Sequence, residues 1–241
     1  MARITGRTRD RTRAVAVMAL AATACLMISG CAPGMPSSPD RASESSSPAA
    51  TGSASPRPAP DAADGPTFAV VGDSISYADS ADFAAGDTGP ESWVTYAREA
   101  GFAFAGGWAE WGATTALMAE SATPVDAETL VLLAGTNDFA LGVPFSETSA
   151  NLDRIVQGVG IEEVVVASVP PMAAYPEGAA ELNQSLEELA GARGWRFVDA
   201  SAGLRGGDGK YREGMTSDGI HPSEQGARVL GEAIAEALRG G

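Results

Sequence analysis

The sequence predicts an α/β fold, a three-layer α/β/α sandwich built around a five-stranded parallel sheet. Two kinds of observation predict it. From residue 67 onward, short apolar runs alternate with longer amphipathic segments, as in successive βα units. Two of the runs, 129–134 and 163–169, are almost continuously apolar, which is typical of strands covered on both faces.

The first half of the domain contains two expected strands and two expected helices. Residues 67–71 (TFAVV) are rich in β-forming side chains and run directly into a Gly-Asp-Ser turn. Residues 91–100 (ESWVTYAREA) are predicted to be a helix, 102–105 a weak strand, and 115–121 a second helix. This gives a β-α-β-α order before the first of the two apolar runs.

The second half continues the alternation. Residues 129–134 (TLVLLA) are expected to form a strand, and 146–159 a helix that carries Leu152, Ile155, Val156 and Val159 on one face. The remaining elements are expected at 163–169 (strand), 178–192 (helix), 195–198 (strand) and 223–238 (helix), with Pro222 suited to the first turn of the last helix. Right-handed crossovers would place the carboxyl ends of all strands at one edge, where such folds bind ligands.

The first thirty residues have the layout of an export signal. Residues 1–13 hold five arginines and one acid, and 14–28 carry no charge. The apolar stretch is shorter than the roughly 20 residues that a permanent span needs. Ile28-Ser29-Gly30-Cys31 resembles a bacterial lipobox, so we expect residues 1–30 to be a lipoprotein signal peptide and Cys31 to be the lipidated N-terminus. An ordinary signal peptide or an uncleaved anchor remains the alternative.

Between this segment and the domain lies a stretch of different composition. Residues 32–66 contain eight prolines and eight serines and no aromatic side chain. Such a segment buries too little apolar surface to offset the entropy of ordering it. We therefore expect a lipidated cysteine and disordered tether over 31–66 and one globular domain over 67–241.

Composition excludes several kinds of site. The formal net charge is −15, and removal of residues 1–30 would make it −19, which argues against a nucleic-acid-binding protein. One histidine and two cysteines cannot build a His/Cys zinc site.

Two polar clusters suggest nucleophilic chemistry. Ser74 directly follows the first apolar run in Gly72-Asp73-Ser74, and His221, the only histidine, lies just before the last helix. A serine hydroxyl needs a base such as histidine, and the histidine needs an acid, which Asp218 can supply three residues earlier. The plainer alternatives are a helix N-cap at Ser74 or Asp73 and a surface histidine capping the last helix.

Two further clusters offer hydrogen-bond donors. Asn137 follows the 129–134 run and could donate its amide to a developing oxyanion. Gly112 could bring a backbone N–H to the same place, with Gly107 as a less favoured substitute. Alone, each would be an ordinary turn or loop residue.

Together the segments GDSIS, WGATT, GTND and DGIHP closely resemble the SGNH hydrolase family, also called GDSL esterases/lipases. The resemblance covers residues 67–238 and implies a flavodoxin-like sheet. It implies that Ser74 is the nucleophile, His221 the general base and then acid, and Asp218 its orienting partner. The oxyanion hole would comprise the Ser74 and Gly112 N–H groups and the Asn137 side chain. The family works through an acyl-enzyme without a metal or organic cofactor.

These expectations combine into one functional hypothesis. We expect an extracytoplasmic serine esterase, lipid-anchored to the outer face of the bacterial cell membrane, that hydrolyses short acyl esters such as O-acetyl groups on carbohydrate. Alternatives are an O-acyltransferase acting on glycans and a non-catalytic glycan-binding surface module.

The expected partners and substrate contacts follow from the same hypothesis. The partner would be a small ester or acylated carbohydrate, with no nucleic acid, no membrane contact beyond the lipid, and a monomeric chain. Loop residues expected near the reactive edge could line the substrate pocket or simply anchor their loops, among them Tyr77, Trp111, Phe139 and Met172.

Overall fold

The computed structural model describes residues 65–240. The expected signal peptide (1–30), the lipidation site at Cys31 and nearly all of the expected tether (31–66) lie outside the described residues. Within 65–240, no helix is both long enough and apolar enough to cross a bilayer.

The centre of the domain is a parallel sheet of five strands, as predicted. In chain order these are β1 (Thr67–Gly72), β2 (Ala103–Ala109), β3 (Thr129–Leu133), β4 (Glu163–Ala167) and β5 (Arg196–Val198). They lie side by side in the order β2-β1-β3-β4-β5, and every neighbouring pair is parallel. All carboxyl ends therefore meet at one edge, and the polar clusters of the sequence follow those ends.

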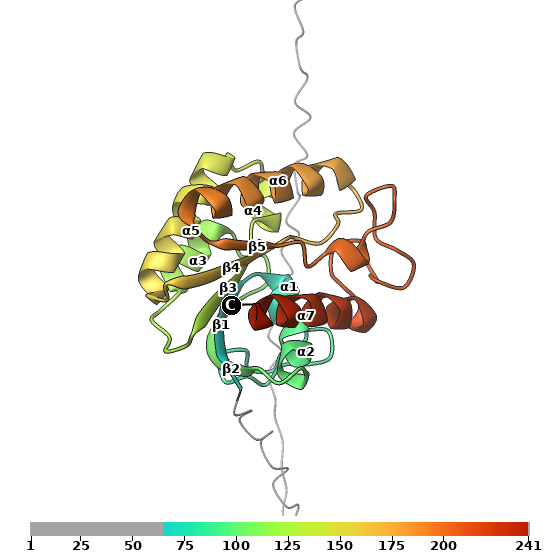
Figure 1. Ribbon diagram of the computed structural model, residues 1–241. Helices are drawn as coiled ribbons and strands as arrows, with labels where there is room; N and C mark the ends of the chain where they lie inside the picture. Colours follow the sequence, from blue (N-terminus) through green and yellow to red (C-terminus); the bar gives the residue numbers. More distant parts are fainter. Residues whose placement is uncertain (1–64, 241) are drawn as a thin grey trace, which may run out of the picture. The chain divides into compact units, whose positions relative to one another are not determined.

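Helices cover both faces of the sheet (Figure 1), which confirms the predicted three layers. The described helices are α1 (Ser74–Tyr77), α2 (Trp93–Glu99), α3 (Thr115–Ser121), α4 (Thr136–Leu141), α5 (Phe145–Val159), α6 (Pro176–Arg193) and α7 (Glu224–Arg239), with a short 3₁₀ turn at Ala202–Leu204. Helices α2 and α7 pack on one face, and α3, α5 and α6 pack on the other.

The two core clusters follow from the alternation of side chains along the strands. Phe68 and Val70 of β1 point to the α2/α7 face, while Ala69 and Val71 point to the opposite face. All four are at most 1% exposed. A fully buried side chain of the size of Val or Phe contributes roughly 1.5–3 kcal/mol, so these two clusters supply most of the stabilisation that fixes the sheet edge.

Strand β2 is longer than the sequence predicted. It runs on through Gly106 and Gly107, and its pairing with β1 shifts by one residue between Phe68 and Ala69. At Gly107 the backbone has φ of 142°, and an added Cβ would lie 1.9 Å from the Val70 carbonyl oxygen. Gly107 is therefore required inside the strand, which separates it from the loop that holds Gly112.

Helix α4 was not predicted, because its sequence reads as a turn. Gly135 has φ of 111° and stands as the residue before the helix, and Gly142, with φ of 71°, ends it. The helix starts directly after β3 at the carboxyl edge of the sheet. Its first turn carries Asn137 and Asp138 toward that edge.

Candidate active site

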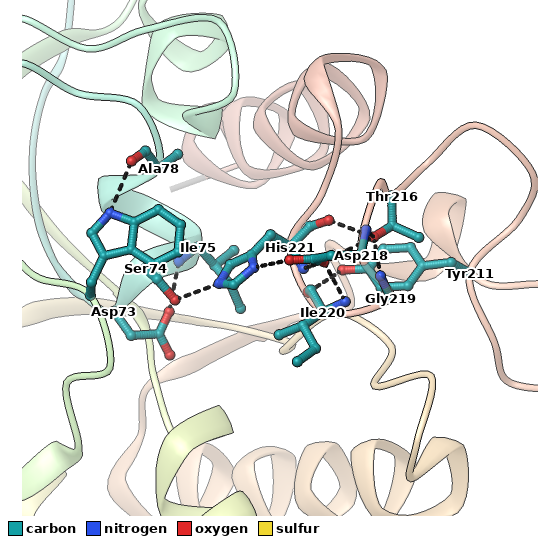
Figure 2. A network of polar contacts seen from close by, with 11 residues as sticks. Asp73, Ser74, Ile75, Ala78, Tyr211, Thr216, Asp218, Gly219, Ile220 and His221 are labelled. Atoms are coloured by element: carbon teal, nitrogen blue, oxygen red, sulfur yellow. Dashed lines mark hydrogen bonds and ion pairs between the residues drawn. The ribbon is translucent and has the colours of Figure 1, made fainter. Parts of the chain in front are cut away.

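The structure brings Ser74, His221 and Asp218 together in one line of hydrogen bonds. Ser74 is the first residue of α1, directly beyond β1, whereas His221 and Asp218 lie in the loop before α7. Ser74 Oγ lies 2.9 Å from His221 Nε2, and His221 Nδ1 lies 2.6 Å from Asp218 Oδ2; both contacts are drawn as dashed lines in Figure 2. Ser74 is 147 residues away from His221 in the chain, so folding brings two distant segments together here.

Asp218 is held as a carboxylate. Its Oδ1 accepts hydrogen bonds of 2.8 Å from the backbone amides of both Ile220 and His221. Burial alone would raise the pKa of Asp218, but the hydrogen bonds from His221 and Ile220 outweigh it and lower that pKa to about 2. An ionised Asp218 can only accept, so the ring proton sits on His221 Nδ1 and Nε2 is free to accept from the Ser74 hydroxyl.

Two residues that the sequence did not single out hold this loop in place. The Thr216 hydroxyl donates to the His221 carbonyl at 2.6 Å and accepts from the Gly219 amide at 2.9 Å. The Tyr211 hydroxyl donates to the Ile220 carbonyl at 2.7 Å. Burial raises the pKa of Tyr211, so its hydroxyl stays protonated and remains a donor. Only the three-dimensional contacts reveal these two supports.

The turn that presents Ser74 is tightly packed. A Cβ on Gly72 would lie 2.4 Å from Ser76 Oγ, so only glycine fits there without a shift. Ser76 is in turn fixed by Trp93, whose indole N–H donates to its hydroxyl at 2.9 Å, and by Ser92, whose hydroxyl donates to its carbonyl at 2.6 Å. Ser74 therefore stands on a helix whose first turn is held by contacts from two neighbouring side chains.

Asp73, directly before Ser74, caps this helix. Its Oδ1 accepts from the Ile75 amide at 3.0 Å, so the N-cap role that the sequence allowed for either residue belongs to Asp73. The side chain is fully buried, and Oδ2 has no hydrogen-bond partner among the described residues. Burial raises the pKa of Asp73 to about 7; the charge of His221 opposes this rise, and the charge of Asp138 adds to it.

The predicted oxyanion donors lie at the same edge of the sheet. The Asn137 amide donates to the Ala113 carbonyl at 2.9 Å, which ties α4 to the loop that carries Gly112. An amide group has two N–H bonds, so one stays available for a ligand. Gly112 has φ of 71°, a left-handed conformation that glycine adopts without strain. Ser74 opens α1, where helices leave backbone N–H groups without an intrahelical acceptor.

Trp111 is an exposed aromatic side chain against the catalytic candidates. It is 54% exposed, and its ring centroid lies 4.8 Å from that of His221. Its indole N–H donates to the Ala78 carbonyl at 3.1 Å. Ala78 has φ of 46°, the sole positive value at a non-glycine position within 65–240, so a strained backbone at the end of α1 holds the ring.

The other predicted pocket residues are less directly placed. Tyr77 stacks on Phe83 with ring centroids 6.4 Å apart, and Phe139 meets Tyr175 edge-on at 6.3 Å. Met172 is buried in the core cluster on the α3/α5/α6 face. It therefore offers no open surface to a substrate.

This chain resembles a known protein family and several solved structures. Residues 70–229 match the model of the GDSL-like lipase/acylhydrolase family. The chain belongs to this family. That confirms the family resemblance drawn from the four motifs. A search of curated proteins finds no match to this GDSL-family chain.

Solved structures show the same fold. A member of the lipolytic G-D-S-L family from Veillonella parvula aligns with a TM-score of 0.58 at 18% identity, covering 72% of this chain and 98% of that one. The lipase/acylhydrolase from Enterococcus faecalis gives 0.54 at 19% identity, covering 73% and 96%. A variant of an acetyl-xylooligosaccharide esterase from Geobacillus Stearmophilus gives 0.55 at 16% identity, covering 72% and 94%.

The described part of this GDSL-family protein offers no metal centre. Across residues 65–240, no three His, Cys, Asp or Glu side chains come close enough to hold an ion.

Proposed function

We propose that this acylhydrolase-family protein is a serine esterase that works through an acyl-enzyme on Ser74. The observation that carries the proposal is the unbroken sequence of contacts from Ser74 Oγ through His221 to the ionised Asp218. A hydroxyl becomes a useful nucleophile when a neutral imidazole accepts its proton, and the imidazolium that forms is stabilised by a carboxylate at the other nitrogen. A purely binding protein has no need of this alignment.

The steps follow from the positions of the groups. Ser74 Oγ attacks the ester carbonyl carbon while its proton moves to His221 Nε2. The oxyanion is met by the Ser74 and Gly112 N–H groups and the free N–H of Asn137. His221 then gives its proton to the leaving alcohol oxygen as the C–O bond breaks, and Ser74 keeps the acyl group. Water, deprotonated by His221, attacks the acyl carbon, and His221 returns that proton to Ser74 Oγ as the bond to Ser74 breaks and the acid leaves.

The substrate is best sought among short acyl esters of neutral, ring-shaped alcohols, O-acetyl carbohydrates above all. Because His221 must protonate the leaving oxygen, the alcohol lies beside His221, and Trp111 presents its exposed face there. Residues 65–240 carry 9 Lys and Arg against 26 Asp and Glu, which disfavours an anionic alcohol. The structurally similar acetyl-xylooligosaccharide esterase supports the same choice.

We also propose an extracytoplasmic location. Support comes from the sequence alone, namely the arginine-rich start, the apolar 14–28 stretch and the lipobox-like Ile28-Ser29-Gly30-Cys31. Metabolic labelling of the full chain with a radioactive fatty acid tests it. Label that disappears in Cys31→Ser is expected, and unlabelled wild-type protein in the cytosolic fraction would contradict it.

The esterase proposal is tested with p-nitrophenyl esters of increasing acyl length, using the purified protein, Ser74→Ala and His221→Ala. We expect activity that peaks at acetyl and falls by about 10⁴-fold or more in both variants. A peak at long acyl chains would refute the short-acyl assignment. Turnover in Ser74→Ala equal to wild type would refute the mechanism. Acyl transfer to an added sugar in preference to water would favour the O-acyltransferase alternative.

Trp111 is tested by comparing two acetate esters that differ only in the alcohol. We expect Trp111→Ala to raise KM about three- to tenfold for an acetylated xylo-oligosaccharide, because aromatic contacts contribute roughly 0.5–1.5 kcal/mol. KM for ethyl acetate, whose alcohol is too small to cover the ring, should stay within about twofold of wild type. Trp111→Phe is the matched control and should keep most of the sugar affinity. Equal effects on the two esters would contradict a sugar platform.

A further inference from the structure

The carboxylate of Asp138 has no part in the chemistry above, yet it is only 1% exposed. It accepts a hydrogen bond of 2.9 Å from the Thr115 backbone amide and a second from the Thr115 hydroxyl. A third comes from the Thr148 hydroxyl at 3.3 Å. A buried carboxylate is costly unless such bonds satisfy it, so the surrounding donors define its place narrowly.

The network continues behind Thr115. Its hydroxyl accepts from the Asn151 side-chain amide at 3.1 Å, and the Asn151 oxygen accepts from Arg154 at 3.1 Å. Thr115, Thr148 and Asn151 are all buried. Asp138 of α4 is thereby joined to both α3 and α5. Three helices meet at this one carboxylate.

The network lies immediately beside the loop that carries Gly112. Thr115 is the first residue of α3 and follows Gly112 by three positions. Asp138 accepts a hydrogen bond from the Thr115 amide, which is one of the N–H groups that the start of a helix leaves without an intrahelical partner. One residue earlier on α4, the side-chain amide of Asn137 donates a hydrogen bond to the Ala113 carbonyl at 2.9 Å. Two successive side chains of α4 therefore hold residues 113 and 115.

We propose that Asp138 is a positioning residue for the oxyanion hole. By fixing where α3 begins, it sets the end of the Gly112 loop, and by anchoring the first turn of α4 it sets the direction of the Asn137 amide. The Gly112 and Asn137 N–H groups can then converge on one oxygen atom. This inference rests on the proposed function, because it assigns a role within that esterase site. It gives a task to a buried charged residue of the GTND segment that the mechanism leaves unused.

A purely structural role predicts different results. If Asp138 only joins helices, its loss should lower the stability of the protein and the fraction of it that is folded and active. It should have no selective effect on transition-state binding. If it positions the donors, its loss should lower kcat and leave KM nearly unchanged. The loss should be much smaller once Asn137 no longer donates, because only the effect on Gly112 then remains. A double-mutant cycle between positions 138 and 137 separates the two roles.

The experiment measures kcat and KM for p-nitrophenyl acetate, and Tm, in Asp138→Asn, Asn137→Ala and the double variant. Loss of one oxyanion donor costs about 10²–10³-fold in kcat, so we expect that loss for Asn137→Ala. Asp138→Asn keeps the shape but replaces an acceptor by a donor, and we expect kcat to fall roughly 10–100-fold with KM within about twofold. The double variant should lose less than threefold beyond Asn137→Ala.

Two further variants keep the inference falsifiable if Asp138→Asn folds poorly. Thr115→Val keeps the backbone amide bond but removes the hydroxyl donor, and we expect kcat to fall about three- to tenfold. Tyr96→Phe, which removes a hydroxyl bond to the Pro90 carbonyl outside the network, is the matched control and should leave kcat unchanged.

The outcomes distinguish this inference from the esterase proposal. Wild-type kcat in both Asp138→Asn and Thr115→Val, or effects of Asp138→Asn and Asn137→Ala that multiply in full, would overturn the inference alone. If the unaltered protein hydrolyses no ester, the proposed function fails and the inference fails with it.

Discussion

The loop that presents Ser74 and the loop that presents His221 are stabilised in opposite ways. The Ser74 loop is buried: Asp73 and Ser76 are 0% exposed, and contacts with Ser76 and the Leu133 carbonyl leave no room for a side chain at Gly72. The His221 loop is partly open, with 25% of the His221 and 48% of the Asp218 side chain exposed. Hydrogen bonds between its side chains and its own backbone hold it.

This difference shifts the pKa values of two carboxyl groups, Asp73 and Asp218, in opposite directions. Asp73, which is fully buried and accepts one hydrogen bond, has its pKa raised to about 7. Asp218, half-exposed and bonded to His221 and two backbone amides, has its pKa lowered to about 2. The environment thus favours a negative charge on Asp218 beside His221 and penalises one on Asp73 beside Ser74, as the proposed mechanism requires. Substitutions in each loop test this contrast.

The largest effect is expected from Asp218→Asn. The asparagine oxygen can still accept from the two backbone amides, but its NH₂ then faces His221 Nδ1 and favours the wrong tautomer. We expect kcat for p-nitrophenyl acetate to fall about 10²–10⁴-fold with little change in Tm. Asp208→Asn, an exposed aspartate outside the site, is the control. Activity within threefold of wild type would show that Asp218 does not orient His221.

Gly72→Ala tests the packing of the Ser74 loop. The new Cβ would lie 2.4 Å from Ser76 Oγ and 3.1 Å from the Leu133 carbonyl oxygen. We expect a loss of about 1–3 kcal/mol in the free energy of unfolding, measured by urea denaturation, and at least a tenfold fall in kcat as Ser74 shifts. Gly191→Ala on α6, where an added Cβ meets nothing within 4 Å, should be neutral. Equal behaviour of the two variants would contradict the packing account.

Asp73→Asn tests the raised pKa. Because the folded pKa of about 7 lies above the usual 3.8, the folded state holds this proton more tightly, and the stability it contributes is present below pH 4 and is lost as the pH rises through 7. The shift corresponds to at most about 4 kcal/mol. We expect the variant to gain Tm relative to wild type at pH 8.5 but not at pH 4. His221 and Asp138 are the charged groups that act on Asp73, and both are retained in the variant. A Tm difference that is the same at both pH values would exclude a titrating Asp73.

The smallest effect is expected from Tyr211→Phe. It removes one hydroxyl donor to the Ile220 carbonyl, while Thr216 and Asp218 still hold the His221 loop. Such a bond contributes roughly 0.5–1.5 kcal/mol, so we expect a two- to tenfold fall in kcat at unchanged KM. Tyr175→Phe, at an exposed ring outside this loop, is the control. A loss as large as that of Asp218→Asn would mean that this loop depends on a single bond.

The sequence was sufficient for the sheet, because the segments of β3 and β4 are almost continuous apolar runs, which is typical of strands covered on both faces. It was insufficient for β2 and α4. In β2, the successive glycines Gly106 and Gly107 do not resemble a strand in the sequence, although Gly107 is needed there for close approach to Val70 of β1. In α4, Gly, Thr, Asn and Asp all favour turns, and tertiary contacts of Asp138 override that preference.

The same division holds at the site. Ser74, His221 and Asp218 were identifiable because few residue types carry nucleophilic chemistry and the chain has one histidine. Tyr211, Thr216 and Asp138 were not, because their roles exist only in contacts that folding creates. Met172 looked like a pocket residue from its loop position, and burial in the core removes it from that set.

The most direct test of the central claim is to trap the acyl group on Ser74. The protein is mixed with p-nitrophenyl acetate, quenched in acid within the first turnovers, and digested for peptide mass spectrometry. We predict one added acetyl group on the peptide containing Ser74, absent in Ser74→Ala and persistent on washing in acid. Steady hydrolysis with no acetylated Ser74, or with the acetyl group on another side chain, would contradict acyl-enzyme catalysis at this site.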